Sequence, residues 1–230
     1  MKQNEINGIK FFYREGTSDL KTFEEVIGRD VYQKKGMKIL PSEHWIDCGG
    51  NVGAFTLLAT SRGAKVTVYE PDPNNCKMIE KNLLLNNLDA DIVCAGLVHN
   101  DIKKANLYVG NNGNVWRNSM FKNWNGKGLK VDCVNFDEVV PDGCCAKIDI
   151  EGAEMPILEN TKRKFKKLVF EWSFDIDGSL PRFWNMIEKL QKEYQVADIG
   201  NTAKFKSRDY DVWQKSWFPA CTNVFCYEKN

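Results

Sequence analysis

Short apolar runs alternate with helix-like segments from about residue 37 to the end of the chain. The strand-like runs lie at residues 44–47, 65–70, 91–95, 145–150, 167–172, 195–199 and 222–227. The helix-like segments lie at residues 54–61, 74–85, 151–161 and 180–194. This alternation predicts a mostly parallel sheet with right-handed crossovers and helices on both faces. The last strand has no helix before it, so we expect it to run antiparallel.

Two segments depart from this alternation. Residues 1–40 are expected to form a cap or a leading helix over the sheet. Residues 104–134 are expected to form an inserted hairpin, with strands at 105–109 and 129–134 joined by a loop from Gly110 to Gly128. A loop of this length is typical of a functional or a mobile segment.

Composition agrees with one α/β domain over residues 1–230, because 43% of the residues are hydrophobic and no repeat or linker interrupts the pattern. Lys and Arg number 32 against 31 Asp and Glu, a formal charge of +1. This balance provides no global field to attract nucleic acid or an anionic membrane, so neither partner is expected. The sequence has no uninterrupted apolar stretch typical of a signal peptide or a membrane span, and a cytoplasmic location is expected.

Eight cysteines are present, and four of them, Cys48, Cys94, Cys144 and Cys145, lie in apolar strand-like runs. A reduced cysteine behaves there as a small hydrophobic residue. The sequence has no C-x-x-C pair of the kind found in zinc sites and redox motifs. We therefore expect free thiols in a reducing compartment.

The first strand of the alternation runs into a glycine-rich loop, Asp47-Cys-Gly-Gly-Asn-Val-Gly53. Ligands of open α/β sheets bind beyond the carboxyl ends of the strands, where glycines allow a tight turn and close approach of a ligand. Glu70 ends the next strand, where a carboxylate can accept both hydroxyls of a ribose. The dinucleotide pattern G-x-G-x-x-G fails, because Cys48 stands where its first glycine should be.

A second motif, Lys147-Ile-Asp-Ile-Glu-Gly-Ala-Glu154, follows the fourth strand of the alternation. Together with the loop at 47–53, it resembles the FkbM family of S-adenosylmethionine-dependent methyltransferases. That family pairs a D-x-G-x-N-x-G loop with a K-[IV]-D-[IV]-E-G-x-E segment. The resemblance covers about residues 28–172. It departs at residues 48–50, where the family often has a small apolar residue followed by Gly-Ala.

The resemblance implies a Rossmann-like class I methyltransferase fold, with a mostly parallel seven-stranded sheet, helices on both faces and an antiparallel last strand. It also implies S-adenosylmethionine as the cofactor and O-methylation of a hydroxyl on a sugar, glycan or other small molecule. The expected cofactor-binding residues are Asp47, Gly49, Gly50, Asn51, Gly53, Glu70, Pro71 and Asp149.

Methyl transfer is an in-line displacement, which benefits from a positioned acceptor in a dry pocket and from a base that takes the hydroxyl proton. Asp149 and Glu151 are expected beside the methyl group, where one of them is the base or orients the acceptor. Glu151 can equally cap the next helix, with Glu154 three residues on in a capping-box arrangement. Lys147 is expected to pair with a strand-end carboxylate.

The acceptor is expected to bind between the long loop and the end of the fifth strand of the alternation. Aromatic faces can stack on sugar C–H surfaces, although a loop that tucks its aromatic side chains into the core is an equal alternative. The candidate acceptor-binding residues are Trp116, Arg117, Ser119, Glu171 and Trp172.

Asp149 and Glu171 end adjacent strands and could chelate Mg²⁺. No third ligand is evident in the sequence, so no metal site is predicted.

Three other functions remain open. Methylation of a nitrogen, RNA or protein is disfavoured by the near-neutral charge and by D-I-E-G, which stands at 149–152 in place of an N-P-P-Y-type tetrad. The others are a non-catalytic module that binds S-adenosylmethionine and an oxidoreductase. The sequence leaves the acceptor and the oligomeric state undetermined.

Overall fold

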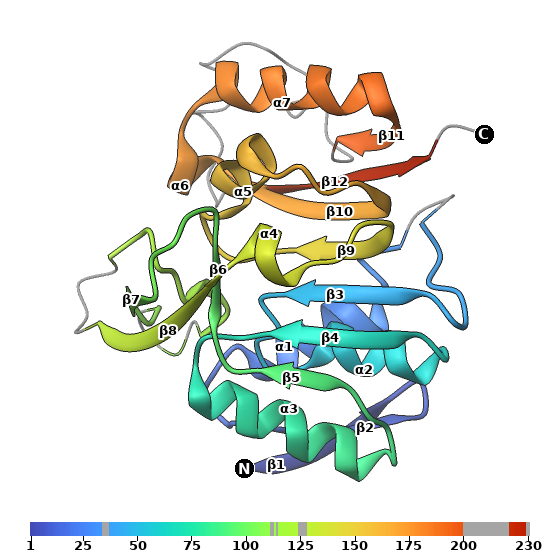
Figure 1. Cartoon of the computed structure of the whole chain (residues 1–230). Coiled ribbons are helices and arrows are strands. Elements are labelled where there is room, and N and C mark those ends of the chain that lie inside the picture. The colour runs from blue at the N-terminus through green and yellow to red at the C-terminus, as the bar shows by residue number, and fades with distance from the viewer. Residues whose placement is uncertain (34–36, 111–112, 114, 124–127, 200–220, 229–230) are drawn as a thin grey trace.

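The central sheet of the protein has seven strands. They are β3 (His44–Cys48), β4 (Lys65–Tyr69), β5 (Asp91–Val93), β9 (Cys144–Ile148), β10 (Phe165–Ser173), β11 (Tyr194–Ile199) and β12 (Cys221–Glu228). Their order across the sheet is β11-β12-β10-β9-β3-β4-β5 (Figure 1). Neighbours from β5 to β10 pair in parallel, whereas β12 runs antiparallel to both β10 and β11. The mostly parallel sheet with an antiparallel last strand is therefore confirmed.

The computed structural model describes the chain except residues 34–36, 111–112, 114, 124–127, 200–220 and 229–230. The side chains of Trp116 and of residues 197–199 also lie outside the described part. Among the described residues, every helix is too short or too polar to cross a membrane.

Helices cover both faces of the sheet, as predicted. One face is covered by α2 (Ala54–Ser61), α3 (Pro73–Leu85) and the π-helical turn η1 (Glu24–Gly28), and the other by α5 (Glu154–Asn160) and α7 (Leu180–Glu193). Side chains alternate between the two faces along each strand. Trp45 therefore packs into the core on the α2 face, whereas Ile46 and Cys48 pack into the core on the α7 face. This alternation determines which strand residues can reach a site on a given face.

Helix α3, which follows β4, begins with a proline, as expected. Pro73 is in the first turn of α3, and the Asp72 side chain accepts a hydrogen bond of 2.8 Å from the Asn74 backbone N–H. Proline suits this position because its missing N–H would have no partner within the helix.

The N-terminal segment begins with a hairpin rather than a helix. Strands β1 (Lys2–Ile6) and β2 (Ile9–Tyr13) pair antiparallel, and the short helix α1 (Asp19–Phe23) leads into η1. Phe11 of β2 stacks on Phe23 of α1 with ring centroids 4.0 Å apart. Strand β2 also packs against α2 and α3, so this segment covers the same face of the sheet as those helices.

A second, smaller sheet lies beside the carboxyl ends of β3 and β4 (Figure 1). It contains β6 (Gly96–Val98), β7 (Lys104–Leu107) and β8 (Leu129–Asn135), in the order β6-β8-β7. The antiparallel pairing of β7 with β8 is the predicted hairpin. The strand predicted at 91–95 ends at Val93, and the chain then enters this second sheet, which the sequence reading did not anticipate.

The prediction of free thiols is wrong for two of the eight cysteines. Cys76 of α3 and Cys94, just after β5, form a disulfide with their Cα atoms 6.1 Å apart. The other six are free, and five of them are buried. The apolar neighbours of Cys94 correctly indicated burial, but they carry no information about which helix lies opposite.

Candidate functional site

The glycine-rich loop between β3 and α2 makes a sharp turn at the carboxyl end of the sheet. Gly49, Asn51 and Gly53 all have positive φ angles, of 84°, 48° and 88°. The N–H groups of Gly49 and Gly50 donate to the Tyr69 carbonyl at 2.9 and 3.1 Å, which ties the loop to β4. A side chain on Gly49 would collide with the Asp149 carbonyl. The loop thus requires glycine and lies directly against the end of β9.

Glu70 is buried at the end of β4, next to this loop. Its Oε2 accepts from the Asn51 N–H at 2.7 Å, and its Oε1 accepts from the Asp72 N–H at 2.9 Å and from Asn75 Nδ2 at 3.3 Å. Burial raises the pKa of Glu70 to about 7, although these hydrogen bonds oppose the shift. Each carboxylate oxygen has two lone-pair directions, so Oε2, which accepts one of these hydrogen bonds, can still accept one from a ligand, whereas Oε1 already accepts two.

The N-terminal hairpin supports Glu70 from behind. The Arg14 guanidinium donates to Asn75 Oδ1 at 2.9 Å, and Asn75 in turn donates to Glu70. Arg14 is itself held by a bidentate pair with buried Asp19, at 2.8 and 2.9 Å. No sequence pattern indicated that Arg14, Asp19 and Asn75 support the site. Their contacts join segments up to 61 residues apart, and no local pattern reveals them.

A buried ion pair lies beneath the glycine-rich loop. Lys147 Nζ is 3.2 Å from Asp47 Oδ1, with side-chain exposures of 5% and 0%. Lys147 also donates to the Gly49 carbonyl at 2.7 Å, and Thr56 donates to Asp47 Oδ2 at 2.7 Å. Burial acts to lower the pKa of Lys147, but the carboxylates of Asp47 and Asp149 outweigh it and raise the pKa. Burial raises the pKa of Asp47. Lys147 therefore has the predicted partner, a strand-end carboxylate.

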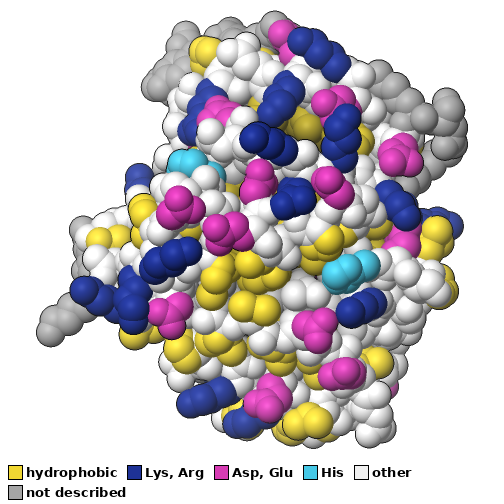
Figure 2. Space-filling model, viewed as in Figure 1, with side chains coloured by type: hydrophobic (Ala, Val, Ile, Leu, Met, Phe, Trp, Pro, Cys, Tyr) yellow, Lys and Arg dark blue, Asp and Glu magenta, His cyan; other side chains and the backbone are white. Residues whose placement is uncertain are grey.

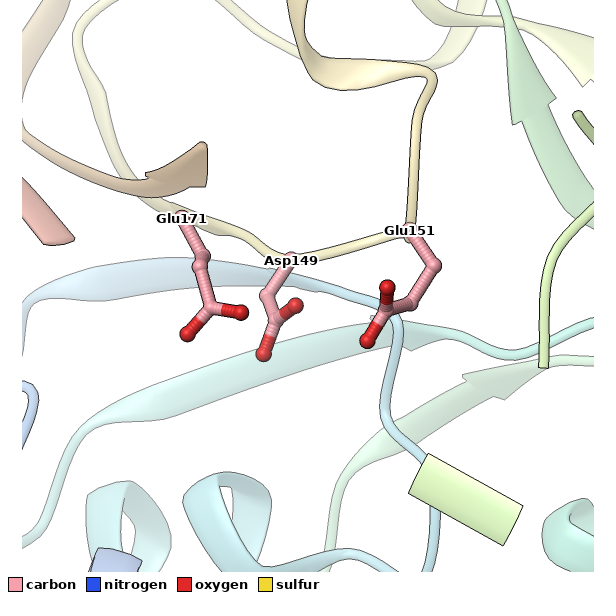
Figure 3. Close-up of side chains that lie close together, drawn as sticks. All are labelled: Asp149, Glu151 and Glu171. Carbon is pink, nitrogen blue, oxygen red and sulfur yellow. The ribbon is translucent and has the colours of Figure 1, made fainter. Parts of the chain in front are cut away.

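Three carboxyl groups meet at the carboxyl ends of β9 and β10. Figure 3 shows Asp149, Glu151 and Glu171 with their carboxyl groups pointing in the same direction and Asp149 in the middle. One oxygen from each lies within 4.8 Å of the others. Burial, followed by the nearby charge of Asp149, raises the pKa values of Glu151 and Glu171 well above normal. The Tyr32 hydroxyl, from the segment after η1, donates to Asp149 Oδ2 at 2.5 Å.

The helix after these acids begins later than predicted. Its N-cap is Ala153, and Glu151 has a left-handed φ of 51°, so the reading of Glu151 as the helix cap is wrong. Glu154 instead reaches back to the N–H groups of Ile150 at 2.6 Å and Gly152 at 2.8 Å. Glu154 thus has a structural role, and Glu151 is left to point into the site.

These groups share one pocket of about 490 Å³, a size typical of small-molecule sites. Of the predicted site residues, those that line it are Gly49, Gly50, Asn51, Glu70, Pro71, Arg117, Asp149, Glu151 and Glu171. Asp47 and Gly53 are outside the lining and support the loop from below.

Two predicted acceptor-binding residues lie elsewhere. Trp172 is on the opposite face of the sheet, 1% exposed and stacked on Phe183 at 4.3 Å, so its assignment to the site is wrong. Ser119 is buried outside the lining, where its hydroxyl donates to the Glu151 carbonyl and accepts from the Phe121 N–H at 3.0 Å. The side chain of Trp116 lies outside the described residues.

A family sequence model described as the methyltransferase FkbM domain matches residues 47–196, well over half of the chain. The protein belongs to the FkbM methyltransferase family. Its cofactor is S-adenosylmethionine. A search of curated proteins finds no significant match.

Solved structures similar to this FkbM methyltransferase share its fold at low identity. A Pyrococcus abyssi tRNA (uracil-54, C5)-methyltransferase with S-adenosyl-L-homocysteine is 10% identical, with a TM-score of 0.51 over 98% of this chain and 43% of that one. A Plasmodium falciparum dimethyladenosine transferase is 11% identical, with a TM-score of 0.52 over 91% and 62%. A Streptococcus mutans protein in complex with SAH is 11% identical, with a TM-score of 0.50 over 95% and 100%.

The chain spans less than two thirds of the length of the first two of these structures. At such low identity the likeness shows the fold alone, and the predicted Rossmann-like methyltransferase fold is confirmed.

Proposed function

We propose that this FkbM methyltransferase transfers the methyl group of S-adenosylmethionine to a hydroxyl oxygen of a sugar, glycan or other small molecule. The observation that carries the proposal is the position of Asp149, Glu151 and Glu171. Their carboxyl groups share one pocket with the glycine-rich loop and Glu70. Hydroxyl groups are hydrogen-bond donors, and carboxylates are the acceptors that orient them most strongly.

The cofactor fits the residues present. The pocket reaches the backbone of Gly49 and Gly50, and Glu70 beside them keeps a lone pair on Oε2 for a ribose hydroxyl. Asn51 and Pro71 line the same part of the pocket. In this proposal Asp47 and Gly53 act indirectly, by holding the loop in place, and Asp149 faces the methionine end.

The N-terminal hairpin belongs to the same proposed unit. Arg14 supports Glu70 through Asn75, and Tyr32 contacts Asp149. These contacts favour one methyltransferase domain over residues 1–230.

S-adenosylmethionine supplies an electrophilic methyl group bound to sulfur. The acceptor oxygen forms a bond to this carbon as the carbon–sulfur bond breaks, and the hydroxyl proton passes to a carboxylate. In this proposal Asp149 or Glu151 takes that proton or orients the hydroxyl, which their position in the pocket lining at the end of β9 supports. Glu171 and Arg117 line the same region and are proposed to contact the acceptor.

The distribution of charge favours a small acceptor over nucleic acid. The formal charge of the chain is +1. Figure 2 shows positive and negative side chains interspersed on the face in view, over the described residues. A protein that binds RNA through its phosphates usually presents a continuous basic surface.

A labelled-methyl transfer assay tests the proposal. The acceptors are panels of sugars, glycans and hydroxylated metabolites, with RNA and protein as competing classes and mass spectrometry to locate the methyl group. Asp149→Asn and Glu151→Gln should each lower turnover more than affinity for S-adenosylhomocysteine, whereas Glu138→Gln, an exposed carboxylate, should change neither. Transfer to nitrogen, RNA or protein would refute the proposal. Cofactor binding without transfer to any acceptor would indicate a non-catalytic module.

A further inference from the structure

The carboxyl groups of Asp149, Glu151 and Glu171 are arranged as the ligands of one ion would be. One oxygen from each lies within 4.8 Å of the other two, and they come from two neighbouring parallel strands (Figure 3). Oxygens that share a Mg²⁺ or Ca²⁺ ion at about 2.0–2.6 Å can lie at most about 4–5 Å apart. Asp149 and Glu171 were candidate chelators from the sequence, which showed no third ligand, and Glu151 fills that position in the structure.

Two buried oxygens at this place have no hydrogen-bond partner among the described residues. One is Oε2 of Glu151, and the other is Oδ1 of Asn223. Asn223 is a neutral residue outside the acidic cluster, and it lies directly opposite Glu171 in the antiparallel pairing of β10 with β12. Residues paired in this way point to the same face of a sheet. Both line the pocket, so an amide oxygen and a carboxylate oxygen are left unsatisfied at the same site.

The cations of the described residues near this cluster already have anionic partners. Lys147 lies closer to Asp47, at 3.2 Å, than to Asp149 of the cluster, at 3.9 Å. Arg117 pairs with Asp175. With all three carboxyl groups ionised, the cluster therefore carries more negative charge than these cations balance, and burial together with this charge raises the pKa values of Glu151 and Glu171. Carboxylate and amide oxygens together are the ligand set of a hard divalent cation.

We propose that Asp149, Glu151, Glu171 and the Asn223 amide oxygen form a binding site for one divalent cation of the Mg²⁺, Mn²⁺ or Ca²⁺ class. Such an ion satisfies both unpartnered oxygens and neutralises the surplus charge. Its place in the pocket also suits it to bind an oxygen atom of the acceptor. Only the binding of an acceptor oxygen to the ion rests on the proposed methylation of a hydroxyl.

Isothermal titration of the EDTA-treated protein, residues 1–230, with MgCl₂, MnCl₂ and CaCl₂ tests the site without cofactor or acceptor. We expect one saturable site for at least one of the three cations. Glu151→Gln and Glu171→Gln should each weaken it at least about tenfold, and Asn223→Ala should weaken it to a smaller extent, because each removes a ligand oxygen. Glu138→Gln, which removes an exposed carboxylate, should leave the affinity unchanged.

Thermal unfolding of the metal-free variants shows whether each of them folds. Glu151→Gln and Glu171→Gln should unfold at or above the wild-type temperature, because each relieves repulsion between carboxylates. Should a variant fail to fold, an anomalous difference map from wild-type crystals soaked in MnCl₂ decides the question, with a peak expected between the four side chains.

The absence of saturable binding up to about 10 mM cation, beyond the range of weak protein sites, would overturn the proposal. So would affinity that is unchanged in both glutamate variants, or a manganese peak elsewhere. Methyl transfer to a hydroxyl that persists in EDTA, in a protein that binds no cation, would reject the metal site and leave the proposed function standing. Cation binding without methyl transfer to any hydroxyl would support the metal site and reject the proposed function.

Discussion

Replacement of Lys147 by methionine should be the most destabilising single change to the polar part of the site. Methionine keeps the length of the side chain but removes the charge that faces Asp47 at 3.2 Å. At an effective dielectric constant near 20, two unit charges at that distance attract with about 5 kcal/mol. The variant also loses the hydrogen bond from Lys147 to the Gly49 carbonyl at 2.7 Å.

The net loss of folding free energy should be smaller than the lost charge attraction and hydrogen bond together, because Asp47 can take up a proton. Its pKa is already raised by burial, and loss of the cation raises it further. Removal of one member of a buried pair typically costs about 3–5 kcal/mol, and we expect Lys147→Met to fall in that range near neutral pH. The penalty should grow as the pH rises above the unfolded pKa of an aspartate and shrink as the pH falls, because a protonated Asp47 needs no cation.

Urea denaturation followed by far-UV circular dichroism measures this loss in a double-mutant cycle with Asp47→Asn. The double variant should recover about 2 kcal/mol or more relative to additivity, because no charge remains unpaired. The exposed pair of Lys104 with Asp132, separated by 3.3 Å against 3.2 Å for the buried pair, provides the control. Lys104→Met should cost no more than about 1 kcal/mol. A cost for Lys147→Met equal to that of the control, or strictly additive single effects, would refute this account of the site.

Three further predictions follow from the same contacts. Affinity for S-adenosylhomocysteine, measured by calorimetry, should rise as the pH passes through about 7, the pKa of Glu70, because in the proposed cofactor site the ionised carboxylate accepts more strongly from a ribose hydroxyl. Glu70→Gln should weaken binding by about 10–100-fold and abolish this pH dependence. The second result is required because Asp72 and Arg14, whose charges act on Glu70, remain in the variant. The folded-state pKa of Glu70 exceeds the ordinary 4.5, so its contribution to the stability of the unliganded protein should decline as the pH rises through about 7. Reduction of the Cys76–Cys94 disulfide, which closes a loop of 18 residues, should cost about 3 kcal/mol and lower Tm by about 6–12 °C; an unchanged Tm in dithiothreitol would contradict this. Tyr32→Phe removes the hydrogen bond to Asp149 and should lower kcat without weakening S-adenosylhomocysteine binding, whereas a loss confined to binding would argue against a link between Tyr32 and the acceptor end.

The parts of the fold that follow from local patterns were predictable. Strand alternation and helical spacing placed the sheet, its antiparallel last strand and most crossover helices, because these patterns depend on residues close in sequence. The glycine-rich loop and Glu70 were predictable for the same reason, since each directly follows a strand. Cys76 and Cys94, and the contact of Arg14 with Asn75, depend on tertiary neighbours and left no local signal.

The error at Trp172 was avoidable. Glu171 and Trp172 are adjacent on β10, and neighbouring residues of a strand point to opposite faces. Assignment of both to one pocket therefore contradicted the geometry that predicted the sheet. Glu171 lines the pocket, and Trp172 packs against α7 through Phe183.

The two ends of the pocket differ in how they are built, and this explains what the family motifs leave undetermined. The proposed cofactor end is formed by strand-end loops that the fold itself requires, with Gly49 and Glu70 in contiguous motifs. The proposed acceptor end is lined by residues from distant segments: Tyr32 after η1, Arg117 in the insertion and Asn223 on β12. Tyr32 and Arg117 lie outside the central sheet, and Asn223 lies on its antiparallel strand, so none of the three follows from the parallel crossover pattern and each can vary while the cofactor end stays constant. Acceptor choice should therefore reside where the sequence pattern is weakest, and the acids at the end of β9, shared by both ends, should remain the fixed point between them.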